Sequence, residues 1–375
     1  MAAEPKTIIL AGGGTGGRLY PGISVAQALR RSVPEARPLF LCTQREIDRT
    51  ILAPTGFEFI PQPIVPPVRT IGGLLKFWRS WRETKDLVQR VLRERQPVAV
   101  LGLGGYAAGR AVRQGAAKDV PTAILNPDVI PGRANQYVIR QVDAVCCQFE
   151  ATREHVSPAH HAKLRFTGCP IREEMRTLPP RDAAAARLGL QPRLNTLVIT
   201  GASQGAQTVN EAVVETLASV KLQGWQILHL SGKEHADRVR AEYRERNIPA
   251  GVIDFTPAMA DVWAVADLAV ARAGASTCAE LTACGVPSIL LPYPFHKDMH
   301  QRANARVLAD AGAAVLIDDE RDRHKNAAKL RPVIEPLLYD ADRRLAMSRA
   351  ASSLGKPGAA DAVAQVITQI LAAGR

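Results

Sequence analysis

The chain is poor in aromatic residues, lacks any close cysteine pair of the Cys-x-x-Cys type, and contains no long uninterrupted hydrophobic run. Its six cysteines form no Cys-x-x-Cys pair, which argues against a zinc site or a disulfide framework and favours a reduced, cytosolic protein. No apolar run approaches the roughly 20 residues of a membrane-spanning helix. The N-terminus also lacks the basic region and apolar core of a signal peptide. We therefore expect a protein that is soluble or lies on a membrane surface without crossing it.

Aromatic residues make up only 5% of the 375 residues, and no zinc-finger or RNP-like spacing is present. This disfavours a nucleic-acid-binding protein. The formal net charge is nevertheless +12, so anionic partners such as phosphorylated substrates or an acidic membrane surface are expected. A content of 46% hydrophobic and 22% charged residues is ordinary for a globular protein.

Short apolar runs alternate with helical patterns along the whole chain. This alternation predicts an α/β fold with parallel sheets covered by helices on both faces. About two domains fit this length, and a change of composition near Leu178–Arg181 places the linker between about residues 170 and 195. The strands are expected at Ile8–Leu10, Leu39–Cys42, Val98–Leu101, Thr122–Leu125, Ala144–Cys147, Leu197–Thr200, Gln226–Leu230, Leu268–Ala271 and Ser288–Leu291.

Four glycine-containing segments each follow an expected strand and precede an expected helix. They begin at Leu10, Leu101, Thr200 and Ala271, and the first reads AGGGTGGRLYPG from Ala11. Such turns let backbone N–H groups and a helix N-terminus approach an anion, although a single one can also be a tight turn for packing alone. The first segment matches a dinucleotide fingerprint, but no acidic residue follows at the expected distance. Four copies favour two domains that hold diphosphate groups from both sides of a cleft.

The segment from Arg272 reads RAGASTCAEL and is expected to enter a helix capped by Ser276 or Thr277. Glu280 is then either a solvated acid near the helix start or a carboxylate that accepts hydrogen bonds from sugar hydroxyls. His296 and His300 follow in the next loop, but no third ligand has suitable spacing, so neither a metal nor another cofactor is expected. Glycine loops, arginines and helix dipoles could stabilise a leaving diphosphate instead.

Six motifs occur in this order along the chain: GGGTGGRLYPG, LGLGGYAAG, TGCPIR, TGASQGAQTVNE, RAGASTCAEL and HKDMHQRANA. The order is typical of one glycosyltransferase family. Over about residues 7 to 315 the chain resembles the MurG family of peptidoglycan N-acetylglucosaminyltransferases. The resemblance implies a GT-B fold of two Rossmann-like domains facing a cleft. It implies a domain of residues 1–172, joined by a final helix at about 356–375, and a donor-binding domain of residues 173–355.

The resemblance also implies the reaction. The family transfers N-acetylglucosamine from UDP-N-acetylglucosamine to the muramyl 4-hydroxyl of a lipid-linked N-acetylmuramyl-pentapeptide pyrophosphate, with inversion at the anomeric carbon. This step belongs to peptidoglycan synthesis, and thus to cell shape and division, at the cytoplasmic face of the bacterial membrane. Two alternatives remain open: a UDP-sugar transferase with another acceptor, and a catalytically silent protein that binds a UDP-sugar or a lipid pyrophosphate.

Most residues of the family's donor site have counterparts in the second half of the chain. The ribose-binding glutamate corresponds to Glu280, and the diphosphate-side arginine to Arg172. Thr256 occupies the position near the uracil, where the family usually has an aliphatic residue. The remaining donor-side positions are Ser203, Gln204, Gly205, Ala275, Ser276, Thr277, Cys278, Ala279 and Gln301. The acceptor diphosphate would meet Thr15, Gly16, Gly17, Gly104, Gly105 and Tyr106.

The chain departs from the family where the reaction takes place. Arg18 replaces a histidine, and Leu125–Asp128 replaces a His-Glu-Gln-Asn segment, although the stretch from Pro131 to Asn135 still fits. Arginine cannot shuttle a proton but can clamp a phosphate, so Arg18 is interpreted either as a partner of a diphosphate or as a solvent-facing residue. Asp128 is the only carboxylate of the altered segment. It is either the general base, or the group that orients the acceptor hydroxyl, or an ordinary turn residue.

A stripe of large apolar residues at helical spacing is interleaved with basic residues. Both features suit a helix that lies on an anionic membrane, although a helix facing the protein core would use the same stripe. The stripe consists of Ile71, Leu74, Leu75, Phe77, Trp78 and Trp81.

Overall fold

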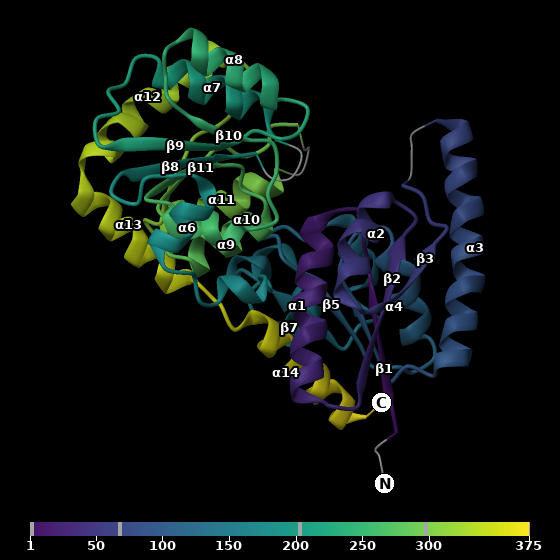
Figure 1. Cartoon of the computed structure of the whole chain (residues 1–375). Helices are drawn as coiled ribbons and strands as arrows, with labels where there is room; N and C mark the ends of the chain where they lie inside the picture. The colour runs from purple at the N-terminus through teal and green to yellow at the C-terminus, as the bar shows by residue number, and fades with distance from the viewer. Residues whose placement is uncertain (1–3, 67–69, 202–204, 296–298, 375) are drawn as a thin grey trace. The chain divides into compact units, whose positions relative to one another are not determined.

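The computed structural model describes residues 4–66, 70–201, 205–295 and 299–374. The chain forms two compact units (Figure 1). Unit 1 contains Met1–Arg172 and the final segment Pro357–Arg375, and unit 2 contains Glu173–Lys356.

Unit 1 is built on a parallel sheet of seven strands in the order β3-β2-β1-β4-β5-β6-β7. The strands are β1 (Lys6–Ala11), β2 (Ala36–Thr43), β3 (Glu58–Gln62), β4 (Ala99–Gly102), β5 (Thr122–Asn126), β6 (Ala144–Cys147) and β7 (Leu164–Arg165). Its helices are α1 (Gly16–Ser32), α2 (Glu46–Leu52), α3 (Ile71–Arg95), α4 (Ala108–Ala116), α5 (Arg133–Val138) and α14 (Ala359–Ala373).

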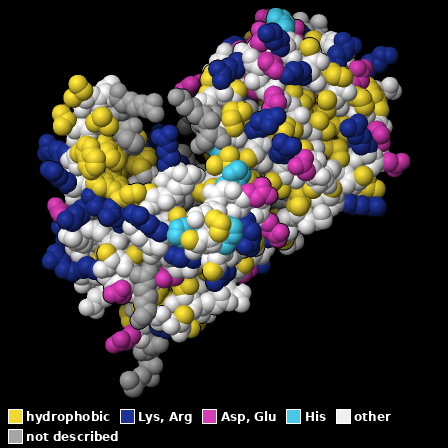
Figure 2. Space-filling view, turned by 180° about the vertical axis from the view of Figure 1, so that it is seen from behind, with side chains coloured by type: hydrophobic (Ala, Val, Ile, Leu, Met, Phe, Trp, Pro, Cys, Tyr) yellow, Lys and Arg dark blue, Asp and Glu magenta, His cyan; other side chains and the backbone are white. Residues whose placement is uncertain are grey.

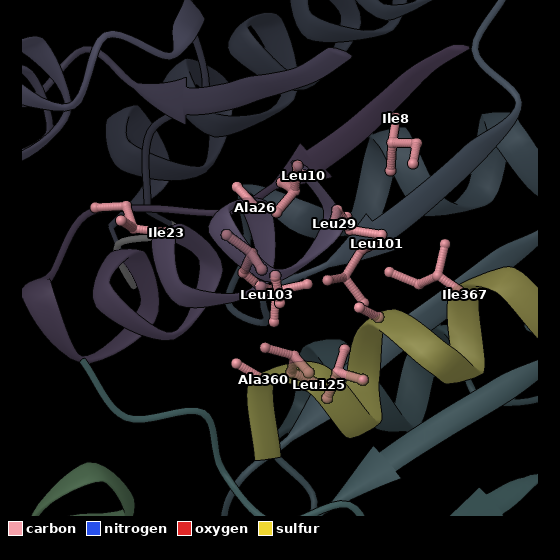
Figure 3. Packing of buried hydrophobic residues seen from close by; sticks show 14 of the residues in the cluster. Ile8, Leu10, Ile23, Ala26, Leu29, Leu101, Leu103, Leu125, Ala360 and Ile367 are labelled. Atoms are coloured by element: carbon pink, nitrogen blue, oxygen red, sulfur yellow. The ribbon is translucent and has the colours of Figure 1, made fainter. Parts of the chain in front are cut away.

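The two faces of this sheet bury separate hydrophobic clusters, as the two-residue period of a strand requires. Ile8 and Leu10 of β1 belong to one cluster, and Ile9 belongs to the other. The last helix of the chain, α14, contributes Val363 and Ile367 to the first cluster. Figure 3 shows Ile367 facing the side chains of the central strands, so the end of the chain is part of the core of unit 1.

Unit 2 contains a parallel sheet of six strands in the order β10-β9-β8-β11-β12-β13. The strands are β8 (Asn195–Thr200), β9 (Trp225–Leu230), β10 (Gly251–Ile253), β11 (Leu268–Ala271), β12 (Ser288–Leu290) and β13 (Ala314–Leu316). Its α-helices are α6 (Arg181–Leu188), α7 (Gln207–Leu217), α8 (Ala236–Glu245), α9 (Met259–Val265), α10 (Ala275–Ala283), α11 (His300–Asp310), α12 (Arg323–Tyr339) and α13 (Ala341–Leu354).

The predicted α/β fold with two doubly wound parallel sheets is confirmed, and each of the nine predicted strands is present. The four strands that the sequence did not indicate are β3, β7, β10 and β13, which are the edge strands of the two sheets. β7 has two residues, and β10 and β13 have three each. An edge strand pairs on one side only, so it needs neither the length nor the continuous apolar run of a central strand.

A buried polar network crosses the core of unit 2 at His229. The side chain of His229 has no exposed surface. Its Nδ1 lies 2.9 Å from the hydroxyl of Tyr243, and its Nε2 lies 3.1 Å from Oδ1 of Asn210. The amide of Asn210 donates to the carbonyl of Ser231, so its Oδ1 accepts from Nε2 of His229. Burial lowers the pKa of His229 from 6.5 to about 3.

This buried histidine makes the stability of the protein sensitive to acid. The unfolded chain takes up a proton on His229 below about pH 6.5, whereas the folded chain does not, so the free energy of unfolding falls as the pH falls. Between pH 7 and pH 5 the loss from this group should be about 2 kcal/mol. Urea unfolding of the wild type and of His229→Gln at both pH values checks this. The expected difference is a flatter pH dependence in the variant, and equal pH dependences would contradict it.

Candidate functional site

The four glycine-containing segments all connect the carboxyl end of a parallel strand to a helix. Two of them follow β1 and β4, which are neighbours in unit 1, and two follow β8 and β11, which are neighbours in unit 2. In both sheets the strand order reverses between these neighbours. Doubly wound folds bind their ligands at this reversal, so each unit has its candidate site where the sequence places its glycines.

The loop between β1 and α1 is fixed by a buried carboxylate that the sequence analysis missed. Asp48 has no exposed surface. Its carboxylate accepts from the backbone N–H of Gly14 at 2.7 and 2.9 Å, and from the N–H and hydroxyl of Thr43 at 2.8 Å each. A Cβ on Gly13 would lie 2.2 Å from this carboxylate. The N–H of Gly14 is therefore committed to Asp48.

The anion-facing part of this loop is consequently the first turn of α1. Thr15 is the N-cap residue, and its side chain makes no capping hydrogen bond. Thr15 and Gly17 are exposed, and Gly16 is half-buried. These three predicted acceptor-side residues thus lie together at a helix N-terminus, where a phosphate is favoured electrostatically.

Two arginines lie against the carbonyl groups of the same loop. Nη1 of Arg18 donates to the carbonyl of Gly13 at 3.3 Å, and Nη1 of Arg45 donates to the carbonyl of Gly14 at 2.7 Å. Burial lowers the pKa of Arg18, while the nearby Tyr106 and Asp128 act in the opposite direction. Arg18 is thus half-buried against the loop rather than pointing into solvent.

The second loop of unit 1, Gly104–Tyr106, lies next to the guanidinium of Arg18. Gly105 has a φ of +75°, and a Cβ at this position would lie 2.9 Å from Cζ of Arg18. The positive φ disfavours any other residue there, and a Cβ would in addition require the Arg18 side chain to shift. Gly104 also has a positive φ of +89°. The hydroxyl of Tyr106 would lie 3.5 Å from a Cβ on Gly14, so the two predicted acceptor-side loops are neighbours in space.

The altered segment after β5 is held by two amide side chains. Nδ2 of Asn135 donates to the carbonyl of Leu125 at 2.8 Å and to Oδ1 of Asn126 at 3.0 Å. Nδ2 of Asn126 donates to the carbonyl of Asp128 at 2.8 Å. Asn135 is only 7% exposed, so its amide acts on the backbone of this segment. Asp128 is half-buried, and Pro127 lines one small recess with Arg18 and Leu125.

Arg172 ends the first of the two chain segments that form unit 1. Its guanidinium lies over the ring of Tyr20, with Cζ 4.6 Å from the ring centroid. Tyr20 lies one turn after Gly16 on α1, so the arginine that was predicted on the donor side is placed beside the first glycine loop.

The helix α10 differs from the prediction at its start. Its N-cap residue is Gly274, so neither Ser276 nor Thr277 caps it. Glycine serves here because an N-cap needs an extended backbone and tolerates the absence of a side-chain acceptor. The side chains of Ala275, Cys278 and Ala279 are buried. Ser276 and Thr277 are half-buried, so only these two and the backbone of this segment can meet a ligand.

Glu280 lies in the second turn of α10 and is half-buried. Its Oε2 accepts a hydrogen bond of 2.9 Å from the indole Nε1 of Trp263. The carboxylate is therefore held in one direction, which the reading as a solvated acid did not anticipate. Trp263 belongs to the candidate site of unit 2, and the sequence analysis missed it because a tryptophan in an apolar segment is normally a core residue.

Two further predicted donor-side residues have defined partners. Oε1 of Gln301, at the start of α11, accepts from the backbone N–H of Tyr293 at 3.0 Å. The side-chain amide donors are thus the groups with which Gln301 can contact a ligand. Thr256 lies shortly before α9, and its hydroxyl accepts from the N–H of Ala258 at 3.1 Å.

The loop after β8 is described only in part. Ser203 and Gln204 lie outside the described residues, as does His296. Gly205 has a φ of +74°, and a Cβ there would lie 2.0 Å from the carbonyl oxygen of Ser231. The same carbonyl accepts from Asn210, so the histidine network in the core also supports this loop. Among the described residues, no three His, Cys, Asp or Glu side chains are arranged to hold a metal ion.

The helix α3 presents its apolar stripe to solvent over its first two turns. Ile71 is 83% exposed, Leu75 67% and Trp78 57%. The core-facing side chains of α3 come later and form a separate row, which consists of Ser80, Thr84, Val88, Val91 and Leu92. The reading in which the stripe faces the core is therefore wrong for the four exposed residues Ile71, Leu74, Leu75 and Trp78. Figure 2 shows this surface at the left of the view, with Lys and Arg side chains beside it.

Trp81 differs from the rest of the stripe because it packs on α4. The guanidinium of Arg110 lies over its ring at 4.2 Å, and the ring of Phe77 lies 5.6 Å away. Both Trp81 and Phe77 are half-buried. Within the described part of the chain, no helix combines the length and the hydropathy needed to cross a bilayer.

Comparison with known proteins gives consistent matches. The glycosyltransferase family 28 N-terminal domain matches residues 8–147, and the glycosyltransferase family 28 C-terminal domain matches residues 196–365. A protein of Halothermothrix orenii is 32% identical over 96% of this chain and 98% of its own. A protein of Thermodesulfovibrio yellowstonii is 33% identical over 97% and 98%. Both are named UDP-N-acetylglucosamine–N-acetylmuramyl-(pentapeptide) pyrophosphoryl-undecaprenol N-acetylglucosamine transferase.

Solved structures show the same fold. The crystal structure of Acinetobacter baumannii MurG superposes with a TM-score of 0.74 and 23% identity, and it covers 97% of this chain and 100% of that one. The glycosyltransferase of kitacinnamycin superposes with a TM-score of 0.69 and 18% identity, over 98% and 100% of the two chains.

Proposed function

Because the chain belongs to the MurG family of family 28 glycosyltransferases, we propose how its own residues carry out the family's reaction. The chain is a UDP-N-acetylglucosamine-dependent N-acetylglucosaminyltransferase of peptidoglycan synthesis. It transfers the sugar to N-acetylmuramyl-(pentapeptide) pyrophosphoryl-undecaprenol, the acceptor for which its relatives are named. The observation that carries this conclusion is the identity of 32–33% over nearly the full length of both chains.

We propose that unit 2 binds the UDP-sugar. The carboxylate of Glu280, held by Trp263, accepts hydrogen bonds from the ribose hydroxyls. The backbone at the start of α10, together with Ser276 and Thr277, meets the phosphate or sugar groups. Gln301 donates from its amide to the sugar, and Thr256 lies at the edge of the uracil. The described geometry supports this arrangement because all these groups lie after the carboxyl ends of parallel strands.

In unit 1, we propose that the first turn of α1 and the loop Gly104–Tyr106 bind the diphosphate of the acceptor. Arg18 supplies positive charge to this diphosphate. Its guanidinium lies beside both loops, and burial lowers its pKa without removing its charge at neutral pH. Arg172 adds a second guanidinium next to the same helix start.

Asp128 is the proposed base. The muramyl 4-hydroxyl attacks the anomeric carbon of the donor, its proton passes to the Asp128 carboxylate, and UDP departs with the bonding electrons. The amides of Asn126 and Asn135 fix the backbone that carries Asp128. In this chain a carboxylate thus takes the part that neither Arg18 nor Leu125 can take.

The acceptor carries a lipid, and we propose that the exposed apolar surface of α3 brings the enzyme to the cytoplasmic face of the cell membrane. The surface consists of the α3 residues Ile71, Leu74, Leu75 and Trp78. The exposed Lys76, Arg79, Arg82 and Lys85 lie on the same helix. Apolar side chains that insert at the interface, flanked by cations that meet anionic lipid, are typical of a peripheral membrane helix.

Replacing Leu75 and Trp78 together with serine should weaken binding to vesicles of anionic phospholipid at least tenfold, because each buried side chain contributes about 1.5–3 kcal/mol. Binding of soluble UDP should stay unchanged. A control variant with Tyr339→Ser and Leu345→Ser removes two exposed apolar residues from unit 2 and should bind vesicles like the wild type. Unchanged vesicle binding by the α3 variant would contradict a role of this surface in membrane binding.

The reaction itself is tested by the release of UDP from UDP-N-acetylglucosamine in the presence and absence of the lipid-linked acceptor. Acceptor-dependent release is the expected result. Release that requires a different acceptor would point to the altered segment Leu125–Asp128 as an acceptor determinant. UDP binding without any release would identify a silent binding protein.

A further inference from the structure

The hydrogen bond between Trp263 and Glu280 joins two helices of unit 2. Trp263 lies on α9 and is 2% exposed, and Glu280 lies on α10 and is half-buried. The indole Nε1 donates to Oε2 of the carboxylate at 2.9 Å. An indole has one N–H and no acceptor, so the direction of this bond is fixed.

The indole of Trp263, which donates this hydrogen bond, is itself held rigidly. Ala260, Val262 and Val265 of α9 are buried. Asp261 of the same helix forms a two-pronged ion pair with Arg187, with N–O distances of 2.6 and 2.9 Å. A buried ring on an anchored helix cannot follow a moving partner, so Glu280 has to adopt the position that Trp263 sets.

This constraint matters for a carboxylate that binds two hydroxyls. A glutamate side chain has three torsions, and ordering it at the moment of binding lowers the affinity. A hydrogen bond to a charged group is stronger than a neutral one. A carboxylate has about four lone-pair positions, so the bond from Trp263 orients the group without saturating it.

We infer that Trp263 is a positioning residue that fixes the Glu280 carboxylate for the ribose hydroxyls, and that it thereby sets the preference of the enzyme for a ribonucleotide over a deoxynucleotide. This rests on the proposed binding of ribose by Glu280. The same helix follows directly on the segment with Thr256, so one element supports both the base side and the ribose side of the nucleotide.

The experiment compares the affinities for UDP and for 2′,3′-dideoxy-UDP, measured by calorimetry on the full-length protein. Trp263→Phe removes the N–H and keeps an aromatic ring. It should reduce the ratio of the two affinities by about three- to tenfold, because only UDP uses the oriented carboxylate. A purely structural role would weaken both nucleotides equally and leave the ratio unchanged, which would overturn the inference.

Trp225→Phe is the matched control. Trp225 is 7% exposed and donates from Nε1 to the carbonyl of Leu338 at 2.9 Å in the same unit. This variant should leave the ratio unchanged. Glu280→Ala distinguishes ribose binding by Glu280 from the positioning of Glu280 by Trp263. If it leaves the preference for UDP intact, ribose binding by Glu280 is wrong. If it abolishes the preference while Trp263→Phe does not change it, only the inference about Trp263 is wrong.

A measurement on the wild type covers the case in which Trp263→Phe does not fold. The four tryptophans of the chain give four indole N–H resonances in an amide-proton NMR spectrum, and Glu280→Gln assigns that of Trp263 by its shift. UDP should shift this resonance and 2′,3′-dideoxy-UDP should shift it much less. Equal shifts with both nucleotides would contradict a role in ribose recognition.

Discussion

Asp128→Asn should lower kcat by about 10²-fold or more, the usual range for the loss of a general base. Asparagine has nearly the same shape as aspartate but cannot accept the proton of the attacking hydroxyl. The bond between Asn126 and the backbone carbonyl of Asp128 does not involve the replaced side chain, so the segment should keep its conformation. The affinity for UDP should change little, because the proposed nucleotide site lies in unit 2.

Steady-state kinetics with saturating UDP-N-acetylglucosamine and lipid-linked acceptor measure this effect. Asp119→Asn is a suitable control because Asp119 is exposed and belongs to the same unit, and it should retain the wild-type kcat. A wild-type kcat in Asp128→Asn would leave Asp128 as a turn or binding residue. A rise in KM without a fall in kcat would assign it to acceptor binding rather than to proton transfer.

Glu280→Ala should weaken the binding of UDP by about 1–3 kcal/mol, the range expected for hydrogen bonds to a charged group. Part of any loss of stability will come from the buried N–H of Trp263, which loses its acceptor. Glu280→Gln separates the two effects, since the amide oxygen can still accept from Trp263 while the charge is absent. It should bind UDP weakly and unfold at nearly the wild-type temperature.

Calorimetric titration with UDP gives the affinities of both variants. Glu245→Ala removes an exposed glutamate from α8 of the same unit and should bind UDP like the wild type. Unchanged affinity in a folded Glu280→Ala protein would contradict the ribose assignment.

The fold was accessible from the sequence because central parallel strands are buried on both faces and therefore appear as continuous apolar runs. Ile8–Leu10 and Leu197–Thr200 are such runs. The edge strand β3 was not accessible, because it contains Pro61 and its only buried residue is the polar Gln62. The helix start at Gly274 was also missed, because the side chains of Ser276 and Thr277 suggested a cap that the backbone of glycine provides instead.

For the candidate sites, the sequence predicted the glycine loops but not the residues that hold the loops and side chains in place. The glycine positions predicted loops in which the backbone lies close to other groups. Gly105 lies close to the Arg18 side chain, and Gly205 lies close to the Ser231 carbonyl. Asp48, which fixes the first loop, and Trp263, which holds Glu280, were not predicted, since each acts on a residue distant from it in the sequence. Charged residues such as Asp48 are seldom fully buried, and a buried tryptophan such as Trp263 is normally read as a core residue without a functional partner.

The activity assigned to this chain is the transfer of N-acetylglucosamine to a lipid-linked muramyl-pentapeptide. Mass spectrometry of the acceptor after incubation with UDP-N-acetylglucosamine tests it most directly. The acceptor should gain the mass of one N-acetylhexosamine residue, with one equivalent of UDP released. The product should have a β-linkage, because the anomeric centre of the α-linked donor is inverted. An acceptor of unchanged mass after prolonged incubation with folded enzyme that binds UDP would contradict this transferase activity.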